Sequence, residues 1–365
     1  MKKLVLVGAG HAHALVLNAW RNAKQPSVEL TLVTPMTHAP YSGMIPGWLA
    51  GQYQFDETVV DFARLCERAG ASVIQAELTR LNPDNNTIEL SNGQTVSYDW
   101  LSLNVGSTLV PPASQAPILA MRPLSTLKAR YEAWLANWQA SADSSPLRLT
   151  AVGGGAAGVE SLLCIRHRLA QLRPDKPIQA RLITRGTTIL PGLSHAARRL
   201  ALTALHDAHV TVQANTDWCE MIAQSSDLII WATGAQAHAW QTDPDRRGNL
   251  QTDSSGFVVV DEQLRSVSHT NVFAVGDCAT LSKPVPKAGV YAVRMGPTLT
   301  TNLLAVIQDK PIVPFTRHGS ALALLNTANN SAIASWGPLG WQGKWVMRWK
   351  DRIDRGFIER LTCST

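Results

Sequence analysis

The segment LVLVGAGHAH at residues 4–13 joins a short apolar run to a glycine-rich turn at the start of the chain. A second segment of the same design, LTAVGGGAAG, occupies residues 149–158. Glycine permits a tight bend and lets backbone N–H groups approach a pyrophosphate, whose charge is stabilised by the N-terminus of the helix that follows. One such turn is weak support, because short glycine clusters also make ordinary strand-to-helix turns. Two of them predict two phosphate-binding loops, each between a strand and a helix.

The composition is that of a folded globular protein. The 365 residues are enough for two or three compact domains, and 45% of them are hydrophobic and 16% charged. The formal net charge is +6, yet the basic residues form no long run and no nucleic-acid-binding module is recognisable. We therefore exclude nucleic acid as a partner. The charge is attributed to attraction of anionic cofactors or of an anionic membrane surface.

The cysteines are widely scattered, at Cys66, Cys164, Cys219, Cys278 and Cys363. They form no C-x-x-C pair and no metal-like spacing, which argues against a disulfide scaffold, a metal site and a redox-active dithiol. This cysteine usage indicates a reducing, cytoplasmic compartment. The apolar run behind the N-terminal lysines is one strand long, and no apolar stretch reaches about 18 residues, so we expect neither a signal peptide nor a membrane-spanning helix.

The strand after each glycine turn ends without the acid that dinucleotide-binding folds often place there for the ribose hydroxyls. The first of these strands, residues 28–33, is followed by Thr34, and the second, residues 180–183, by Thr184 and Arg185. Arg185 has two interpretations. It accepts a ribose 2′-phosphate and favours NADPH, or it is a solvated residue at a strand end.

Later segments extend this pattern. A buried strand at residues 227–231 leads into a small-residue turn through Gly234, and residues 271–279 contain Val275-Gly276-Asp277. This last strand must return to the first unit if Asp277 is to meet the first nucleotide. The sequence thus predicts an α/β fold with two three-layer, Rossmann-like dinucleotide-binding domains, the second inserted in the first. The expected parts are a discontinuous first dinucleotide-binding domain at 1–110 and 240–310, an inserted second dinucleotide-binding domain at 111–239 and a C-terminal region at 311–365.

The order of these motifs, with a Val105-Gly106-Ser107 turn between them, resembles the FAD-dependent pyridine nucleotide-disulfide oxidoreductase superfamily. The likeness covers residues 1 to about 310 and implies FAD in the first domain and a nicotinamide dinucleotide in the second. The chain also resembles type II NADH dehydrogenases, which pass electrons from NADH through FAD to quinone. Its segments at residues 10–13, 40–46, 286–294 and 349–354 look like the flavoprotein found fused N-terminal to selenide water dikinase.

This resemblance implies a role for individual residues. Around FAD it places Gly8, Gly10, His11, Ala12, Pro40, Tyr41, Gly106, Gly276, Asp277, Lys287 and Gly289. Around the nicotinamide dinucleotide it places Gly153, Gly155, Gly158, Arg185 and Gly234. Glu160 resembles the acid beside the nicotinamide.

The sequence departs from the pattern at two positions. His13 replaces the third glycine of the first motif, so we expect looser packing of helix on strand there. Val290 stands where quinone-reducing relatives commonly have a glutamine, which leaves the acceptor open between a quinone and another small molecule.

Several side chains keep two interpretations. Lys287 precedes an expected helix that begins near Gly289. Either it is a cation that stabilises reduced flavin, or it is a solvated lysine on the surface. His11, His13 and His38 act as acids or bases, or they satisfy backbone groups. The segment around Pro40 and Tyr41 covers a flat ring or forms a rigid loop.

The C-terminal region contains an expected amphipathic, basic helix at residues 341–361. Its apolar residues recur every four positions, at Trp341, Trp345, Trp349, Ile353 and Phe357, and the basic residues beside them are Lys344, Arg348, Arg352 and Arg355. Such a helix inserts into a membrane interface, packs on the protein itself or packs on a second copy in a homodimer.

Our first hypothesis from the sequence is an FAD-dependent NAD(P)H dehydrogenase that passes electrons to a quinone or another small acceptor. We expect it in the cytoplasm, either free or peripheral on the inner face of the cytoplasmic membrane. The alternative is a flavin-binding partner or redox sensor in selenium metabolism with little nicotinamide turnover. The missing acids at Thr34 and Thr184 are the reason to retain this alternative.

Overall fold

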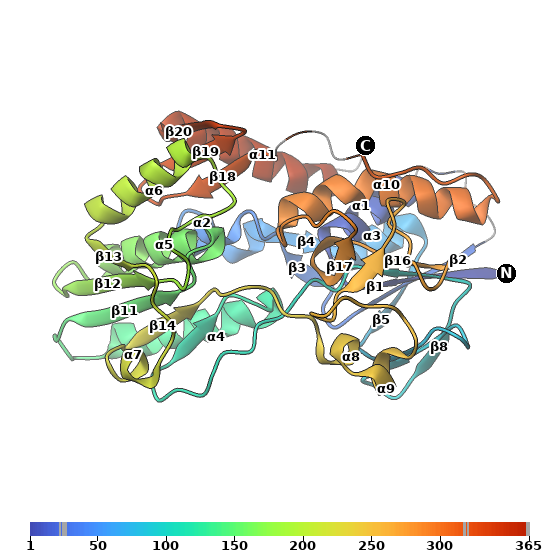
Figure 1. Cartoon of the computed structure of the whole chain (residues 1–365), viewed down its shortest axis with the longest axis horizontal. Coiled ribbons are helices and arrows are strands. Elements are labelled where there is room, and N and C mark those ends of the chain that lie inside the picture. Colours follow the sequence, from blue (N-terminus) through green and yellow to red (C-terminus); the bar gives the residue numbers. More distant parts are fainter. Residues whose placement is uncertain (22, 24–27, 317–318, 320, 363–365) are drawn as a thin grey trace.

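The computed structural model describes residues 1–362 except 22, 24–27, 317–318 and 320, so Cys363 lies outside the described residues. The chain forms two halves side by side, each built on a five-stranded parallel sheet (Figure 1). The predicted α/β fold class is confirmed.

The first sheet has the order β16-β9-β1-β2-β5 and carries the first glycine turn. Its strands are β16 (Val272–Ala274), β9 (Trp100–Leu103), β1 (Lys2–Val7), β2 (Val28–Thr34) and β5 (Ser72–Gln75). Leu4 to Val7 of β1 are at most 2% exposed, as a central parallel strand covered on both faces requires. The helices of this half are α1 (His11–Trp20), α3 (Phe62–Ala69) and α10 (Gly289–Ile307), and α10 packs along α1.

The second sheet has the order β10-β14-β11-β12-β13 and carries the second glycine turn. Its strands are β10 (Ile118–Ala120), β14 (Leu228–Trp231), β11 (Leu147–Val152), β12 (Ile178–Ile183) and β13 (Val210–Gln213). The helices of this half are α4 (Leu124–Ala140), α5 (Ala156–Leu172), α6 (His195–Asp207) and α7 (Glu220–Gln224).

Shorter elements surround the sheets. The first half has an antiparallel meander of β6 (Leu78–Asn82), β7 (Thr87–Leu90) and β8 (Thr95–Ser97). It also has two strand pairs, β3 (His38–Pro40) with β4 (Val59–Asp61) and β15 (Val258–Val260) with β17 (Ala279–Leu281). Its short helices are α8 (Ala239–Thr242) and α9 (Pro244–Arg247). Helix α2 (Ile45–Leu49) packs on α5 of the second half. Single 3-10 turns lie at η1 (Phe55–Thr58) and η2 (Gly276–Cys278).

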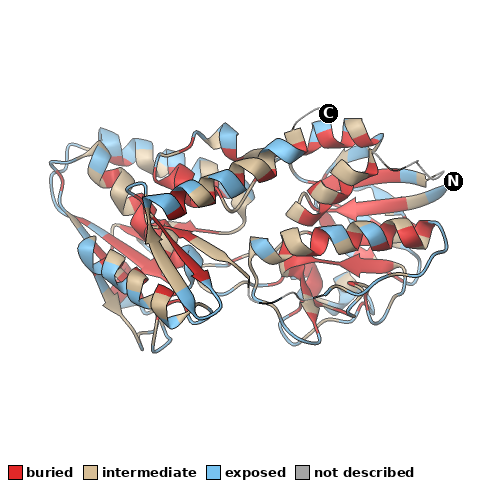
Figure 2. Cartoon of the chain, turned by 90° about the horizontal axis from the view of Figure 1, so that it is seen from above, coloured by how far each residue is buried: buried red, intermediate tan, exposed pale blue. Residues whose placement is uncertain are grey.

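Two crossing segments connect the halves. They run antiparallel at Thr108 and Gln236, whose backbone N–H groups each donate to the other's carbonyl at 2.9 Å. Each half has its own buried interior, and Figure 2 shows these as two separate groups of buried strands and inner helix faces.

The C-terminal region bridges the halves. It consists of an antiparallel sheet of β18 (Ala323–Asn326), β19 (Ala332–Trp336) and β20 (Leu339–Gly343), followed by α11 (Lys344–Thr362). Leu325 and Ile333 of the sheet belong to the core of the second half, whereas Phe357 of α11 belongs to the core of the first. In Figure 1, α11 runs from one half to the other above the space between them.

Two details of the expected C-terminal helix are wrong. The helix begins at Lys344, because Trp341 pairs with Ala334 as part of β20. The apolar stripe is also not continuous on one surface. Phe357 is 2% exposed within the core, while Trp345 and Ile353 are 49% and 40% exposed.

Candidate active site

Both glycine turns need glycine for a steric reason. Gly8 and Gly153 follow β1 and β11 with φ of +99° and +121°, a backbone region that L side chains rarely adopt. A Cβ at Gly8 would lie 2.5 Å from the Asn104 carbonyl oxygen, and a Cβ at Gly153 would collide with the Ala232 carbonyl. Each turn therefore lies directly against the end of the neighbouring strand of its own sheet.

Asn104, at the end of β9, organises the first turn. Its Oδ1 accepts hydrogen bonds from the backbone N–H groups of Ala12 at 3.1 Å and His13 at 3.4 Å, and its Nδ2 donates to the Val275 carbonyl at 3.0 Å. The side chain is 3% exposed. It thus joins the start of α1 to the strand ends that precede Gly106 and Asp277. Sequence reasoning missed Asn104, although its position directly after a buried strand was the available signal.

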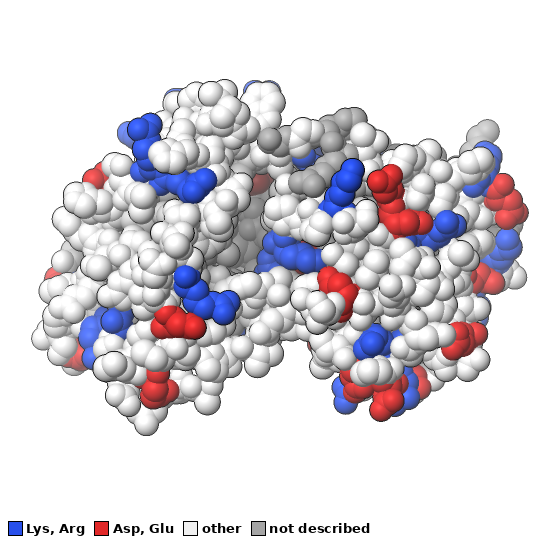
Figure 3. All heavy atoms as spheres, in the orientation of Figure 1, with Lys and Arg blue, Asp and Glu red and all other residues white. Residues whose placement is uncertain are grey.

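A cavity of about 950 Å³ lies between the two halves, near the upper end of the roughly 300–1,000 Å³ of ordinary ligand pockets. Figure 3 shows the hollow between the halves, with Lys and Arg atoms on its wall. Both glycine turns reach this cavity. The predicted site residues that line it are Gly8, Gly10, His11, Pro40, Gly106, Gly155, Glu160, Gly234, Asp277, Lys287 and Gly289.

The other predicted residues lie behind or away from the cavity wall. A Cβ at Gly158 would strike the Gly153 carbonyl, so Gly158 supports the turn from behind, and Gly276 supports Asn104 in a similar way. Ala12 contributes its N–H to Asn104, and Arg185 is exposed after the end of β12. The Tyr41 ring stacks on Phe357 with centroids 4.5 Å apart and lies 5.0 Å from the His11 ring.

An ion pair across the cavity joins the two halves. Arg122, which follows β10 of the second half, contacts Asp277 of the first half with Nη1 2.8 Å from Oδ2. The Ser107 hydroxyl donates to the same carboxylate oxygen at 3.2 Å and also contacts Arg122, whose Nη2 donates to the Lys287 carbonyl at 3.2 Å. Sequence reasoning missed Arg122. Its place beside a proline after an apolar strand was the only local signal.

The Lys287 ammonium contacts other groups than Arg122 does. It donates to the Ala279 carbonyl and lies 3.8 Å from the centre of the Phe257 ring. Burial lowers the pKa of Lys287, while nearby negative groups, Asp277 among them, oppose that shift. The Lys287 ammonium is therefore already held by a carbonyl and an aromatic face.

Glu160, in the first turns of α5, is a half-buried acid on the cavity wall. Its Oε1 accepts a hydrogen bond of 2.7 Å from the backbone N–H of Asn326. Burial raises the pKa of Glu160 to about 7, and the charge of Lys350 limits this rise. Lys350, from α11, donates to the Gly43 carbonyl at 2.6 Å and to Asp354 at 2.7 Å.

The three candidate histidines differ in their surroundings. Burial lowers the pKa of His11 and of His13 to about 4, so both rings are neutral at pH 7. His13 bridges the Gly8 carbonyl at 2.7 Å and the Ser102 hydroxyl at 2.9 Å, and this ring fills the space that a third glycine would leave. His11 contacts the Ser42 hydroxyl at 2.9 Å on the cavity wall. His38 lies 3.9 Å from Asp61, away from the cavity.

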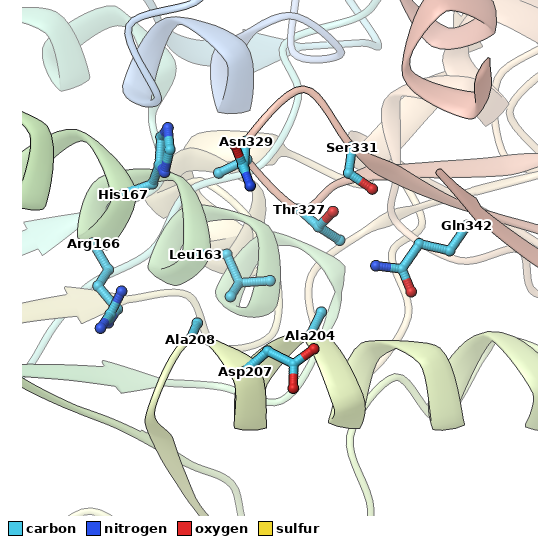
Figure 4. Close-up of a pocket in the computed structure, with 11 residues that line it drawn as sticks. Leu163, Arg166, His167, Ala204, Asp207, Ala208, Thr327, Asn329, Ser331 and Gln342 are labelled. Atoms are coloured by element: carbon cyan, nitrogen blue, oxygen red, sulfur yellow. The ribbon is translucent and has the colours of Figure 1, made fainter. Parts of the chain in front are cut away.

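A second hollow, of about 280 Å³, lies between α5, α6 and the turn after β18. Figure 4 shows Leu163 of α5 in its middle, with Asp207 of α6 and Gln342 of β20 on its sides. It contains none of the predicted site residues.

In the described part of the chain, no group of three or more His, Cys, Asp or Glu side chains is arranged to hold a metal ion. None of the helices in the described ranges is long and apolar enough to cross a membrane. Cys66, Cys164, Cys219 and Cys278 are free thiols.

Two parallel sheets, each with a glycine turn at its carboxyl edge, define the class of α/β proteins with two dinucleotide-binding folds. The chain belongs to the pyridine nucleotide-disulphide oxidoreductase family, whose model matches residues 2–296. This confirms the superfamily that the sequence motifs predicted. The similarity to the flavoprotein fused to selenide water dikinase stays a prediction.

Individual relatives agree with this assignment. The type II NADH:quinone oxidoreductase of Haemophilus influenzae is 29% identical over 230 residues, which are 56% of this chain and 51% of that protein. The sulfide:quinone oxidoreductase of Aquifex aeolicus matches the structure with a TM-score of 0.79 at 17% identity, covering 99% of this chain and 91% of that one. NDH2 of Plasmodium falciparum, solved in complex with NADH, matches with a TM-score of 0.75 at 15% identity, covering 98% of each chain. At these identities the structural matches establish the fold.

Proposed function

We propose that this protein is an FAD-dependent NAD(P)H dehydrogenase that passes a hydride from a nicotinamide dinucleotide to FAD and the electrons on to a quinone or another small acceptor. The observation that carries the proposal is the single cavity reached by glycine turns from two separate sheets. Relatives named type II NADH:quinone oxidoreductase and NDH2 in complex with NADH support it. When bound, FAD supplies the hydride and electron chemistry.

The cavity wall offers one glycine turn to each of two dinucleotides. Gly8 and Gly10 at the start of α1 would hold the FAD pyrophosphate, and Asp277 would accept hydrogen bonds from the ribityl or phosphate end. Gly155 at the start of α5 would face the pyrophosphate of the nicotinamide dinucleotide. This arrangement supports the proposed FAD-binding domain at 1–110 and 240–310 and the proposed NAD(P)H-binding domain at 111–239.

Glu160 is proposed to hold a proton beside the nicotinamide and to release it when the acceptor is reduced. A carboxyl group with a pKa of about 7 is partly protonated at neutral pH, as proton transfer requires. Its Oε1 is fixed by the N–H of Asn326, so Oε2 would carry the exchanging proton. A quinone takes up two protons with two electrons, and Glu160 would supply one of these protons.

We further propose that the protein binds a membrane surface through exposed apolar side chains of its C-terminal region, which we call the apolar patch. They are Trp336 and Leu339 at the β19–β20 turn and Trp345 and Ile353 on α11, which are 55%, 50%, 49% and 40% exposed. Exposed basic residues on α11 lie beside the patch, at Lys344, Arg348 and Arg352. Indole rings next to Lys and Arg suit an anionic membrane interface. A second copy of this chain is the competing occupant of the patch.

The experiment that tests the dehydrogenase is oxidation of NADH and of NADPH by the FAD-loaded protein with a panel of quinones and selenium species as acceptors. We expect turnover with at least one reductant and at least one acceptor. Preference for NADPH would support a 2′-phosphate contact at Arg185, which is exposed after β12. The alternative, a flavin-binding partner in selenium metabolism, is not favoured, because the relatives are named as NADH dehydrogenases and quinone reductases.

A further inference from the structure

The cavity wall carries three acidic side chains, although the cofactors proposed for it are anionic. Among the described residues on its wall, the acids are Glu77, Glu160 and Asp277, the arginine and lysine side chains are Arg122 and Lys287, and the histidines are His11 and His238. A carboxylate beside a pyrophosphate is unfavourable unless a counter-ion is present. Asp277 is such a carboxylate, and its side chain is only 14% exposed.

Arg122 is the cation that meets Asp277. Its guanidinium contacts the carboxylate at 2.8 Å, the Ser107 hydroxyl, and the Lys287 carbonyl at 3.2 Å. These three partners all belong to the first half of the molecule. The backbone of Arg122, in contrast, continues β10 in the second half, where the N–H of the preceding residue, Met121, bonds the Trp231 carbonyl at 3.0 Å.

Lys287 does not replace Arg122 in this role. The Lys287 ammonium is held by the Ala279 carbonyl and lies over the face of Phe257. A planar guanidinium with several donors can contact a carboxylate, a hydroxyl and a carbonyl together, which an ammonium at that place does not do.

We propose that Arg122 is the counter-ion that offsets the charge of Asp277 beside an anionic dinucleotide, so that the second half of the molecule contributes a positioning residue to FAD binding in the first half. The inference rests on the proposed function for the identity of the cofactor. It also predicts a charge balance. The wild-type pair is neutral, loss of the guanidinium leaves one negative charge, and loss of the carboxylate leaves one positive charge.

A double-mutant cycle tests the proposal on the full chain. Apoprotein of the wild type, Arg122→Met, Asp277→Asn and the double variant is titrated with FAD, and the dissociation constant is read from flavin fluorescence. We expect R122M to weaken FAD binding at least tenfold when Asp277 is present and by less than about twofold in the D277N background. Arg122→Lys keeps the charge but not the planar set of donors, so it should recover only part of the affinity.

The flavin midpoint potential provides a second readout. A purely structural role of Arg122 would not shift this potential in opposite directions in the two single variants. Reduced flavin carries more negative charge, so R122M should lower the potential, D277N should raise it, and the double variant should lie near the wild type. A tenfold change in the relative affinity for reduced and oxidised FAD corresponds to about 30 mV for this two-electron couple.

Two controls keep the outcome clear. Arg148→Met removes the arginine of a similar ion pair, with Asp227 at 2.6 Å, far from the cavity wall, and should change neither readout. Arg122→Gln is the second neutral variant if R122M does not fold. Equal losses for R122M with and without Asp277, or an unchanged potential in both neutral variants, would overturn the proposal. Failure of the proposed function would instead appear in the wild type, as absence of NAD(P)H oxidation by the flavin-loaded protein.

Discussion

The carboxylate of Glu160 accepts a hydrogen bond of 2.7 Å from the backbone N–H of Asn326. This bond connects the helix of the second glycine turn to the C-terminal region, 166 residues further along the chain. The Asn326 side chain continues the contact, since its Nδ2 donates to Gln52 at 2.6 Å. The acid on the cavity wall is thereby fixed by a segment outside both parallel sheets.

The raised pKa of Glu160 should make the stability of the protein depend on pH. Burial raises this pKa from 4.5 to about 7, so in that window the folded protein holds a proton that the unfolded chain has lost. The free energy of unfolding therefore falls as pH rises through the window, by on the order of 3 kcal/mol in total. Glu160→Gln, which keeps the acceptor oxygen, should remove this dependence. Urea unfolding of both proteins at pH 5 and pH 8 measures this difference. If the free energy of unfolding changed equally with pH in the wild type and in Glu160→Gln, the raised pKa of Glu160 would be contradicted.

Local sequence predicted the two glycine turns well, because strand, turn and helix follow one another within about ten residues and their steric needs are local. The contacts that complete the site were not predictable in this way. Asn104 meets Ala12 across 92 residues, and Arg122 meets Asp277 across the boundary between the two halves. No local pattern encodes such pairs.

The C-terminal region illustrates a different limit of sequence reasoning. A four-residue repeat of apolar residues correctly predicted a helix, but it could not separate core from surface. Phe357 fills the core of the first half, whereas Trp341 belongs to an antiparallel strand. Both outcomes depend on which surface the region packs against.

The buried pair of Lys350 and Asp354 should be sensitive to the loss of one partner. Each residue is 5% exposed, and Lys350 also bonds the Gly43 carbonyl. Lys350→Met leaves an uncompensated acid inside the protein, which should lower the free energy of unfolding by about 3–5 kcal/mol. Urea unfolding at pH 7 measures the loss. The double change Lys350→Met with Asp354→Asn should recover a large part of it, and simple additivity of the two single changes would refute the explanation.

Gly153→Ala should disrupt the second turn and leave the first intact. The residue has φ of +121°, and the new methyl group would collide with the Ala232 carbonyl. We expect at least a tenfold loss of NADH affinity and a lower melting temperature, with FAD affinity within about twofold of the wild type. Gly192→Ala, where a Cβ meets no atom within 4 Å, is the matched control. Equal loss of both cofactors would show that the turns are not independent.

Asn104→Ala should weaken the first turn. The change leaves two N–H groups at the start of α1 without their acceptor, and each unsatisfied buried group costs about 1–3 kcal/mol. It also removes one of the hydrogen bonds to the Val275 carbonyl, which keeps the Cys278 thiol as a partner. We expect lower stability together with weaker FAD binding, measured by thermal unfolding and by FAD titration. Intact FAD affinity in a destabilised protein would limit Asn104 to a structural role.

Binding to a membrane surface should depend on the apolar patch of Trp336, Leu339, Trp345 and Ile353. Trp345→Ser with Ile353→Ser should reduce flotation with vesicles that contain phosphatidylglycerol, because both side chains are exposed on α11. Met221→Ser removes a side chain that is 74% exposed on α7, and it should have no effect. If the wild type does not float but sediments as a dimer that the double change dissociates, a second copy covers the patch.

The central claim is that one cavity brings a nicotinamide dinucleotide to an FAD held by the first glycine turn. Rapid anaerobic mixing of the FAD-loaded protein with NADH or NADPH tests it most directly, through the visible absorbance of oxidised flavin. We expect this absorbance to disappear rapidly in a single turnover with at least one of the two reductants. Flavin that stays bound and oxidised with both reductants would contradict the account.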